Sequence, residues 1–141
     1  NFINRLPKEP KRGVFFPIVD VEKDDKLKVL AERGQLVPRV KKFIEAVEQH
    51  YDTKVVIYSG QYFYEKYLKD EFNDQLFWLA HYCKCDEVHD LIQYSIQNPS
   101  LNDQVVAWQF TSEGKVDGID KNVDLNYVPA YFWKQIIGSP E

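Results

Sequence analysis

Methionine is absent from all 141 residues of this sequence, including the first position. Asn1 is therefore not an ordinary translation start, and we expect the sequence to be part of a longer polypeptide. No apolar run reaches the roughly 20 residues that a membrane-spanning helix needs. Residues 1–12 are polar and contain prolines and lysines, so they do not resemble a signal peptide. We therefore expect no membrane among the partners.

A basic surface is also lacking. The sequence holds 18 Lys and Arg residues against 22 Asp and Glu residues, which gives a net charge of −4. The two signs are interspersed, and nucleic-acid binding relies on clustered Lys and Arg, so we expect no nucleic acid partner. The hydrophobic share of 44% is enough for one core and hardly for two, which predicts a single domain over residues 1–141.

Cysteine is scarce, with Cys83 and Cys85 as the only two. Two cysteines one residue apart close a very small ring and seldom bridge, so we expect small, partly buried side chains without a disulfide. With His81 and His89 they could be pictured as zinc ligands, but structural zinc sites pair C-x2-4-C with distant ligands. We expect no metal here and interpret His81 as a polar residue at the end of a strand.

Short apolar runs mark the predicted strands, and apolar residues at helical spacing mark the predicted helices. The segment 22–35 is polar and is predicted to be a loop, while 86–97 stays undecided between a loop and a helical turn. A turn at Asp117-Gly118 predicts a small hairpin between 115–117 and 122–126. The predicted strands are 14–21, 54–58, 76–82 and 104–110, and the predicted helices are 36–51, 61–68 and 128–137, the last one ending at Gly138.

Alternating strands and helices are typical of β/α units on a parallel sheet. We therefore predict an α/β fold, an incomplete TIM-like β/α barrel with parallel strands, flanking helices and a C-terminal β-hairpin. Such sheets carry their functional groups at the C-terminal ends of the strands.

Two acids end the first predicted strand, in the segment FFPIVDVEKDD. Side chains alternate along a strand, so Asp20 and Glu22 share a face, with Cα atoms about 6.6 Å apart. Repulsion raises the pKa of one carboxyl, which leaves one group protonated beside one charged group, as acid catalysis beside an electrostatic stabiliser requires. The alternative interpretation is a solvated acidic patch that also includes Asp24 and Asp25.

Aromatic and amide side chains stand at the ends of the other predicted strands. Rings can stack against sugar faces, and Gln and Tyr can bind hydroxyl and amide groups. Each residue alone is more often a packing residue, but their shared placement predicts a carbohydrate site. A third acid, Asp124, lies near the end of the sheet. The candidate sugar-binding residues are Tyr58, Trp78, Tyr82, Trp108 and Gln109.

The segments DVE, VVIYSG, FWLAHY and VVAWQFTSEGKVDGIDKNVDLN, in this order and spacing, resemble glycoside hydrolase family 25 over about residues 15–126. These are the lysozyme-type muramidases of bacterial and phage lysins. The resemblance implies cleavage of the β-1,4 bond between N-acetylmuramic acid and N-acetylglucosamine in peptidoglycan glycan strands. It also implies no cofactor, no metal, and an extracellular or cell-wall location.

The resemblance also implies roles for single residues. Glu22 matches the general acid, and Asp20 matches the partner that stabilises positive charge or orients the acetamido group of the sugar. Asp124 matches the acid of the closing motif, and the five sugar-binding candidates match pocket-lining positions. Family members open with a strand that carries a further aspartate, which is lacking before Phe15. We therefore expect the C-terminal two-thirds of a catalytic module, monomeric once its N-terminal portion is included.

Two other functions stay open at this point. One is a non-catalytic module that binds peptidoglycan on the same scaffold. The other is a chitinase-like family 18 hydrolase, although that family has a longer acidic motif before its glutamate, where FFPIVDVE has apolar residues.

Overall fold

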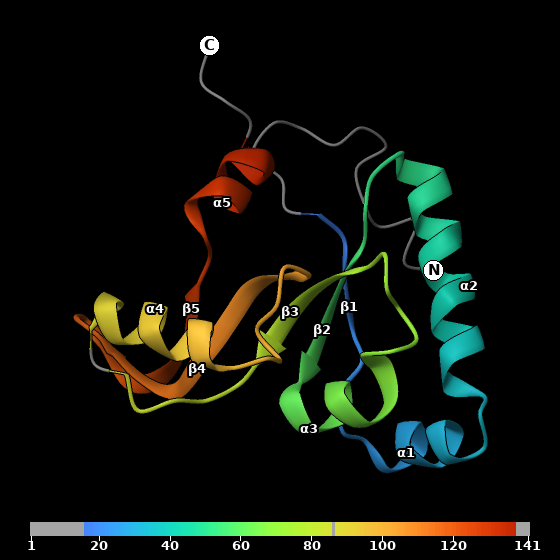
Figure 1. Ribbon diagram of the computed structural model, residues 1–141, viewed down its shortest axis with the longest axis horizontal. Helices are drawn as coiled ribbons and strands as arrows, with labels where there is room; N and C mark the ends of the chain where they lie inside the picture. The colour runs from blue at the N-terminus through green and yellow to red at the C-terminus, as the bar shows by residue number, and fades with distance from the viewer. Residues whose placement is uncertain (1–15, 86, 138–141) are drawn as a thin grey trace.

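The computed structural model describes residues 16–85 and 87–137. In this part of the chain one five-stranded sheet has the order β1-β2-β3-β4-β5. The first four strands run parallel and the last runs antiparallel, so the prediction of an incomplete β/α barrel with a closing hairpin is confirmed (Figure 1). The strands are β1 (Ile18–Asp20), β2 (Val56–Gly60), β3 (Leu76–Ala80), β4 (Val105–Val116) and β5 (Ile119–Tyr127).

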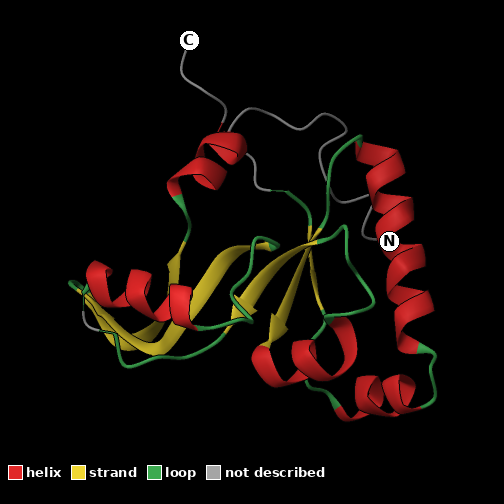
Figure 2. Ribbon diagram, viewed as in Figure 1, coloured by secondary structure: helices red, strands yellow, loops and turns green. Residues whose placement is uncertain are grey.

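Helices follow most of the parallel strands (Figure 2). The larger core fills the space between them and one face of the sheet, with residues from α2, η2, α4 and β1 to β4. The other face holds a smaller cluster around Val56, Val106 and Phe132. No helix among the described residues is both long and apolar enough to cross a membrane. The helices are α1 (Asp25–Glu32), α2 (Leu36–Tyr51), α3 (Gln61–Phe63), the π-helical turn η2 (Tyr64–Leu68), α4 (Val88–Gln97) and α5 (Ala130–Ile137).

Helix α2 has the predicted bounds of 36–51. Its buried residues recur every three or four positions, which places one continuous stripe against the sheet. The helix ends where Asp52 adopts a left-handed conformation with φ of 49°. The buried stripe consists of Leu36, Val40, Ile44, Val47 and Tyr51.

Two helices differ from the sequence prediction. The predicted loop after Glu22 contains α1, which begins because Asp24 accepts hydrogen bonds from the backbone N–H groups of Lys26 and Leu27. The undecided segment 86–97 contains α4, which begins with a capping box between Glu87 and Asp90. Local capping therefore starts both helices. The proposed stop at Gly138 and the predicted strand start at residue 14 lie outside the described residues.

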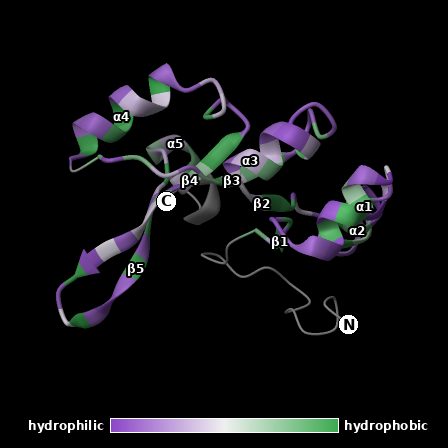
Figure 3. Cartoon of the chain, turned by 90° about the horizontal axis from the view of Figure 1, so that it is seen from below, coloured by the Kyte–Doolittle hydropathy of each residue, from purple (hydrophilic) through white to green (hydrophobic). Residues whose placement is uncertain are grey.

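The β4–β5 hairpin is longer than predicted and projects from the rest of the chain (Figure 3). It turns at Asp117-Gly118, where Gly118 has a φ of 84°. At Gly114 an added Cβ would meet the Leu125 side chain and lie 2.9 Å from the carbonyl oxygen of Val123. Glycine at 114 therefore allows the close approach of the two strands.

Candidate active site

The backbone around Val21 fixes the spacing of the two acids. The Val21 N–H donates to the carbonyl of Tyr58 at 2.9 Å, and the Val21 carbonyl accepts from the Ser59 hydroxyl at 2.8 Å. Val21 and Ser59 are both buried on the helix-covered side. Because side chains alternate, Asp20 and Glu22 project from the opposite face, where both are exposed. Ser59 was not predicted from sequence, where it only marked the end of a strand.

The environment raises the pKa of both acids. Burial raises the pKa of Asp20, and burial followed by the charge of Asp20 raises the pKa of Glu22. The two carboxyl groups therefore interact, as the sequence prediction requires. Desolvation is the larger cause, and repulsion, which the sequence argument invoked alone, is the smaller one.

Tyr58 lies beside Asp20 on the neighbouring strand. Its hydroxyl donates to Oε1 of Gln109 at 2.7 Å. Burial first, and then the nearby groups of Glu22, Tyr82, Asp124 and Asp20, raise the pKa of Tyr58 to about 12. The phenol therefore stays protonated around neutral pH, and these four predicted site residues all lie near enough to act on it electrostatically.

Trp78 completes an aromatic pair with Tyr58. The two residues are register partners on β2 and β3, and their rings meet edge to face at 5.3 Å. The Trp78 indole donates to Oδ1 of Asn126 at 2.8 Å, and Asn126 lies opposite Gln109 across β4 and β5. Three side-chain contacts and the strand pairing of Gln109 with Asn126 connect these four residues from β2, β3, β4 and β5, which we name the aromatic–amide ring. Asn126 was not predicted as a separate site residue, although it stands two positions after Asp124 in VDLN.

Small residues stand next to the aromatic–amide ring. Gly60 and Ala80 are register partners, each two positions after Tyr58 or Trp78 on the same face. A Cβ built on Gly60 would meet no atom within 4 Å. Open space therefore adjoins Tyr58 on the side toward the ends of the strands, where a ligand could approach the acids.

Tyr82 follows β3 at the rim of this site and is 56% exposed. The chain on both sides of it is attached to β4, because the His81 N–H donates to the Gln109 carbonyl at 3.1 Å and the Cys83 N–H donates to the Phe110 carbonyl at 3.0 Å. These bonds place Tyr82 near Tyr58, whose pKa it helps to raise.

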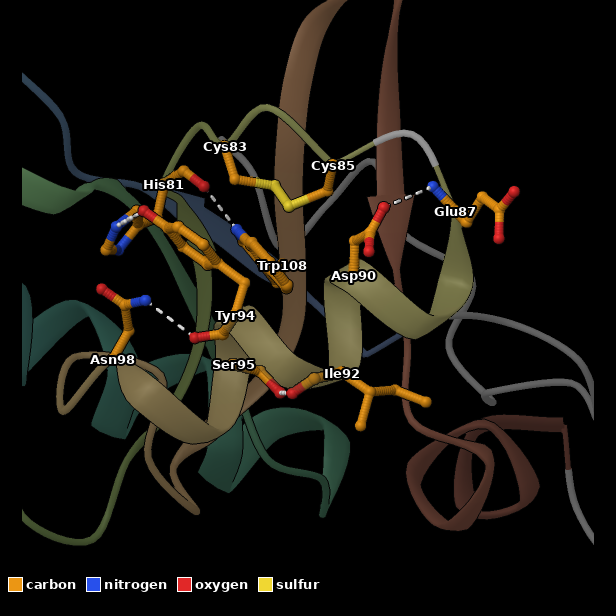
Figure 4. Close-up of a disulfide and its surroundings, with 10 residues drawn as sticks. All are labelled: His81, Cys83, Cys85, Glu87, Asp90, Ile92, Tyr94, Ser95, Asn98 and Trp108. Carbon is orange, nitrogen blue, oxygen red and sulfur yellow. Dashed lines mark hydrogen bonds between the residues drawn. A yellow bond between two sulfur atoms is a disulfide. The ribbon is translucent and has the colours of Figure 1, made fainter.

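Trp108 does not line this face, which corrects the sequence prediction. It is only 3% exposed and stacks on Tyr94 of α4, with ring centroids 5.5 Å apart (Figure 4). Its indole donates to the carbonyl of His81, and His81 itself is buried against the Tyr94 hydroxyl at 2.9 Å. Consecutive residues of a strand face opposite sides, so only one of Trp108 and Gln109 can reach the acids. Gln109 does so.

Cys83 and Cys85 form a disulfide, which corrects the expectation of unpaired cysteines (Figure 4). Their Cα atoms are 5.5 Å apart, within the range that disulfides span. Residues i and i+2 of an extended segment point to the same side, and this orientation outweighs the small size of the ring. Both side chains are partly buried, as predicted. Among residues 16–85 and 87–137, no group of three or more His, Cys, Asp or Glu side chains is arranged to hold a metal ion.

A hollow of about 560 Å³ lies elsewhere. It is lined by Ala31, Gly34, Val37, Pro38, Lys41 and residues 65–71. None of the predicted site residues lines it. Its lining mixes lysines, acids and apolar residues, whereas the acids that stand beside hydrogen-bonded aromatic residues lie at the strand ends. We therefore assign the candidate site to the strand ends.

Comparisons with known proteins agree with this geometry. The uncharacterized protein YegX of Escherichia coli O157:H7 is 33% identical over 115 residues, which cover 82% of this chain and 37% of that protein. The solved structure of a family 25 glycosyl hydrolase from Bacillus anthracis is 27% identical, with a TM-score of 0.68, over 95% of this chain and 58% of that one. The Clostridium perfringens spore cortex lytic enzyme SleM is also 27% identical, with a TM-score of 0.58, over 82% of this chain and 37% of that one.

The chain thus spans between 37% and 58% of the length of these relatives. A sequence model of the family described as glycosyl hydrolases family 25 matches residues 1–119, which is most of the chain. The half-barrel sheet, with two interacting carboxyl groups at the end of a parallel strand, agrees with that match. The chain belongs to family 25 of the glycosyl hydrolases.

Proposed function

We propose that this chain is the part of a peptidoglycan hydrolase that carries the acid catalyst, and that it cleaves the β-1,4 bond between N-acetylmuramic acid and N-acetylglucosamine. Glu22 is the general acid that protonates the leaving oxygen. The observation that carries the proposal is the electrostatic coupling of Glu22 to Asp20 at the end of a parallel strand, where burial and that charge both raise the Glu22 pKa. A raised pKa keeps a proton available for the leaving group.

The other acids have electrostatic roles in this proposal. Asp20 stabilises the positive charge that develops on the sugar ring or orients its acetamido group, which requires a position beside Glu22. Asp124 adds a third negative group near the Tyr58 phenol. Tyr58, Trp78 and Tyr82 supply the aromatic surface against which a sugar stacks.

Two further observations support a cell-wall substrate and location. The related SleM is named a spore cortex lytic enzyme, and a further structure with the same fold is a phage endolysin catalytic domain. The Cys83–Cys85 disulfide suits an oxidising compartment. We therefore propose that the protein acts on glycan strands outside the cytoplasm, at the bacterial cell wall.

The release of reducing ends from purified peptidoglycan tests the proposal. The parent protein is expected to release them, and Glu22→Gln is expected to lower the rate about 10²- to 10⁴-fold, because the amide is isosteric but cannot donate a catalytic proton. Glu113→Gln is the matched control, since Glu113 is an exposed acid on the hairpin. Equal rates for the parent and Glu22→Gln would contradict the assignment of Glu22 as the acid.

A non-catalytic glycan-binding module is the second candidate. The observation that favours it is the aromatic surface of Tyr58, Trp78 and Tyr82, which can stack against a sugar without cleaving it. Co-sedimentation with insoluble cell walls separates the two functions. A binder sediments with the walls and releases no reducing ends, whereas a hydrolase releases them.

A further inference from the structure

The aromatic–amide ring has a defined hydrogen-bond polarity. An indole N–H can only donate, so the atom of Asn126 that faces Trp78 at 2.8 Å must be the carbonyl oxygen Oδ1. The amide nitrogen Nδ2 consequently turns away from Trp78. Within the described part of the chain no protein group accepts a hydrogen bond from this nitrogen, and Asn126 is exposed.

Tyr58 has the opposite polarity. Its hydroxyl proton is donated to Oε1 of Gln109 at 2.7 Å. The phenol oxygen therefore offers only lone pairs to a ligand, and its pKa of about 12 keeps the proton in place through the neutral range. The ring thus presents an acceptor at Tyr58 and two N–H donors at Asn126.

We propose that Asn126 is a specificity-determining residue, held in orientation by Trp78, that donates a hydrogen bond to the carbonyl oxygen of an N-acyl group on the bound sugar. An N-acyl group carries one N–H donor and one carbonyl acceptor, so it matches both polarities of the ring. A free amino group is protonated and has no acceptor, so it leaves the Asn126 donors without a partner. This inference rests on the proposed function and adds the residue that recognises the N-acyl group.

The neighbouring negative charge of Asp124 favours a protonated amino sugar, and a variant can increase that effect. Asp124 lies two positions before Asn126 on the same face of β5. Asn126→Asp keeps an oxygen for the Trp78 indole, removes both N–H donors and adds a second negative charge beside Asp124. The variant is therefore expected to bind an N-acylated sugar less well and an amino sugar better.

The test compares fully N-acetylated peptidoglycan with the same peptidoglycan after chemical de-N-acetylation. The quantity measured is the ratio of kcat/KM for the two substrates. The parent is expected to prefer the acetylated substrate, and Asn126→Asp is expected to lower the ratio about tenfold, which corresponds to one hydrogen bond. Asn122→Asp is the matched control, because it makes the same exchange on the same exposed face of β5 four residues before Asn126.

A second variant tests the role of Trp78. Trp78→Phe keeps an aromatic side chain at this position but removes the indole N–H donor, so the Asn126 amide is free to turn. In this background Asn126→Asp is expected to change the ratio less than it does in the parent. Thermal unfolding of every variant checks that the fold is retained.

The outcomes separate the two proposals. If the parent releases no reducing ends, the proposed function is wrong and this inference falls with it. If the parent is active but Asn126→Asp leaves the ratio unchanged, or Asn122→Asp changes it equally, the role of Asn126 alone is overturned.

Discussion

The phenol of Tyr58 donates a hydrogen bond of 2.7 Å to the side chain of Gln109, which follows 51 residues later in the chain. The bond joins β2 to β4 across the intervening strand β3. It can do so because β3 carries the small Ala80 next to Gln109. The Tyr58 side chain is therefore attached to β2 through its backbone and to β4 through Gln109, two strands that are not neighbours in the sheet.

Removing this bond is expected to destabilise the protein. Gln109 is only 4% exposed, so Tyr58→Phe leaves its Oε1 without the phenol donor in a buried position. The expected loss in the free energy of unfolding is about 1–3 kcal/mol, measured by urea denaturation. Tyr131→Phe is the control, because Tyr131 is 57% exposed. Equal losses for the two variants would show that the bond contributes nothing to stability.

The raised pKa values of the acids predict a pH-dependent stability. Because the folded state raises the pKa of Glu22 above its ordinary value of 4.5, the folded protein holds this proton more tightly than the unfolded chain does. Stability therefore falls as the pH rises from 4.5 through the folded pKa, and the penalty is complete once the pH lies above the folded pKa. Glu22→Gln is expected to raise the Tm at pH 7, and its advantage should shrink as the pH falls below 4.5.

Asp20→Asn is expected to behave in the same way, since burial raises the pKa of Asp20. Differential scanning calorimetry between acid and neutral pH measures both differences, with Glu113→Gln as the control. A Tm advantage that grows toward acid pH would have the wrong sign and would refute the electrostatic description of the pair.

Two glycines, Gly114 and Gly60, are expected to respond differently to substitution by alanine: the first loses stability and the second keeps it. At Gly114 a Cβ would meet Leu125 and the Val123 carbonyl, so Gly114→Ala should cost about 1–3 kcal/mol of unfolding free energy. At Gly60 the Cβ enters open space and φ is −75°, which alanine adopts freely. Gly60→Ala is therefore expected to preserve stability but to weaken glycan binding, because its methyl group occupies space beside Tyr58. Unfolding and co-sedimentation with cell walls measure the two effects, and a loss of stability at Gly60 as large as at Gly114 would contradict the packing argument.

The disulfide predicts a simple thiol count. Protein folded under oxidising conditions and then denatured without reductant should expose no free thiol, and after reduction it should expose both, because Cys83 and Cys85 are the only cysteines. The bond closes a ring over a sequence separation of 2, so its loss should cost only about 1.5 kcal/mol in the loop-entropy description. A thiol assay of the parent protein tests the thiol count. Urea denaturation of the double variant Cys83→Ser/Cys85→Ser tests the loss in unfolding free energy. Reactive thiols before reduction would disprove the pairing.

The elements that were predicted well carry their signal within one segment. Helix α2 could be predicted with its bounds because five buried residues repeat at helical spacing. Helix α1 was missed because it is short and its apolar stripe, Leu27, Leu30 and Ala31, is small and only partly buried. Its signal was the capping carboxylate of Asp24, which entered the sequence analysis only in the alternative interpretation of a solvated acidic patch. Capping residues followed by weakly periodic segments therefore merit the same weight as apolar stripes.

The site could be predicted in its residue types but not in all its orientations. The alternation of one strand placed Asp20 and Glu22 on the same face, as the structure shows. Trp108 was assigned to the wrong face because the sequence does not show which of two adjacent residues turns inward. Ser59 and Asn126 were missed because their roles depend on contacts with Val21 and Trp78, which are 38 and 48 residues away.

The orientation of Trp108 and Gln109 depends on an irregularity in β4. Phe77 is the register partner of Val105, whereas the next residue, Trp78, is the partner of Ala107, so β4 has one residue more than β3 at this point. If β4 continued without this irregularity, with Val106 opposite Trp78, the two faces of the rest of the strand would exchange, turning the bulky Trp108 toward the acids and the amide of Gln109 toward Tyr94. This one extra residue in β4 therefore decides whether the sheet presents a hydrogen-bonding surface or an obstruction to a sugar.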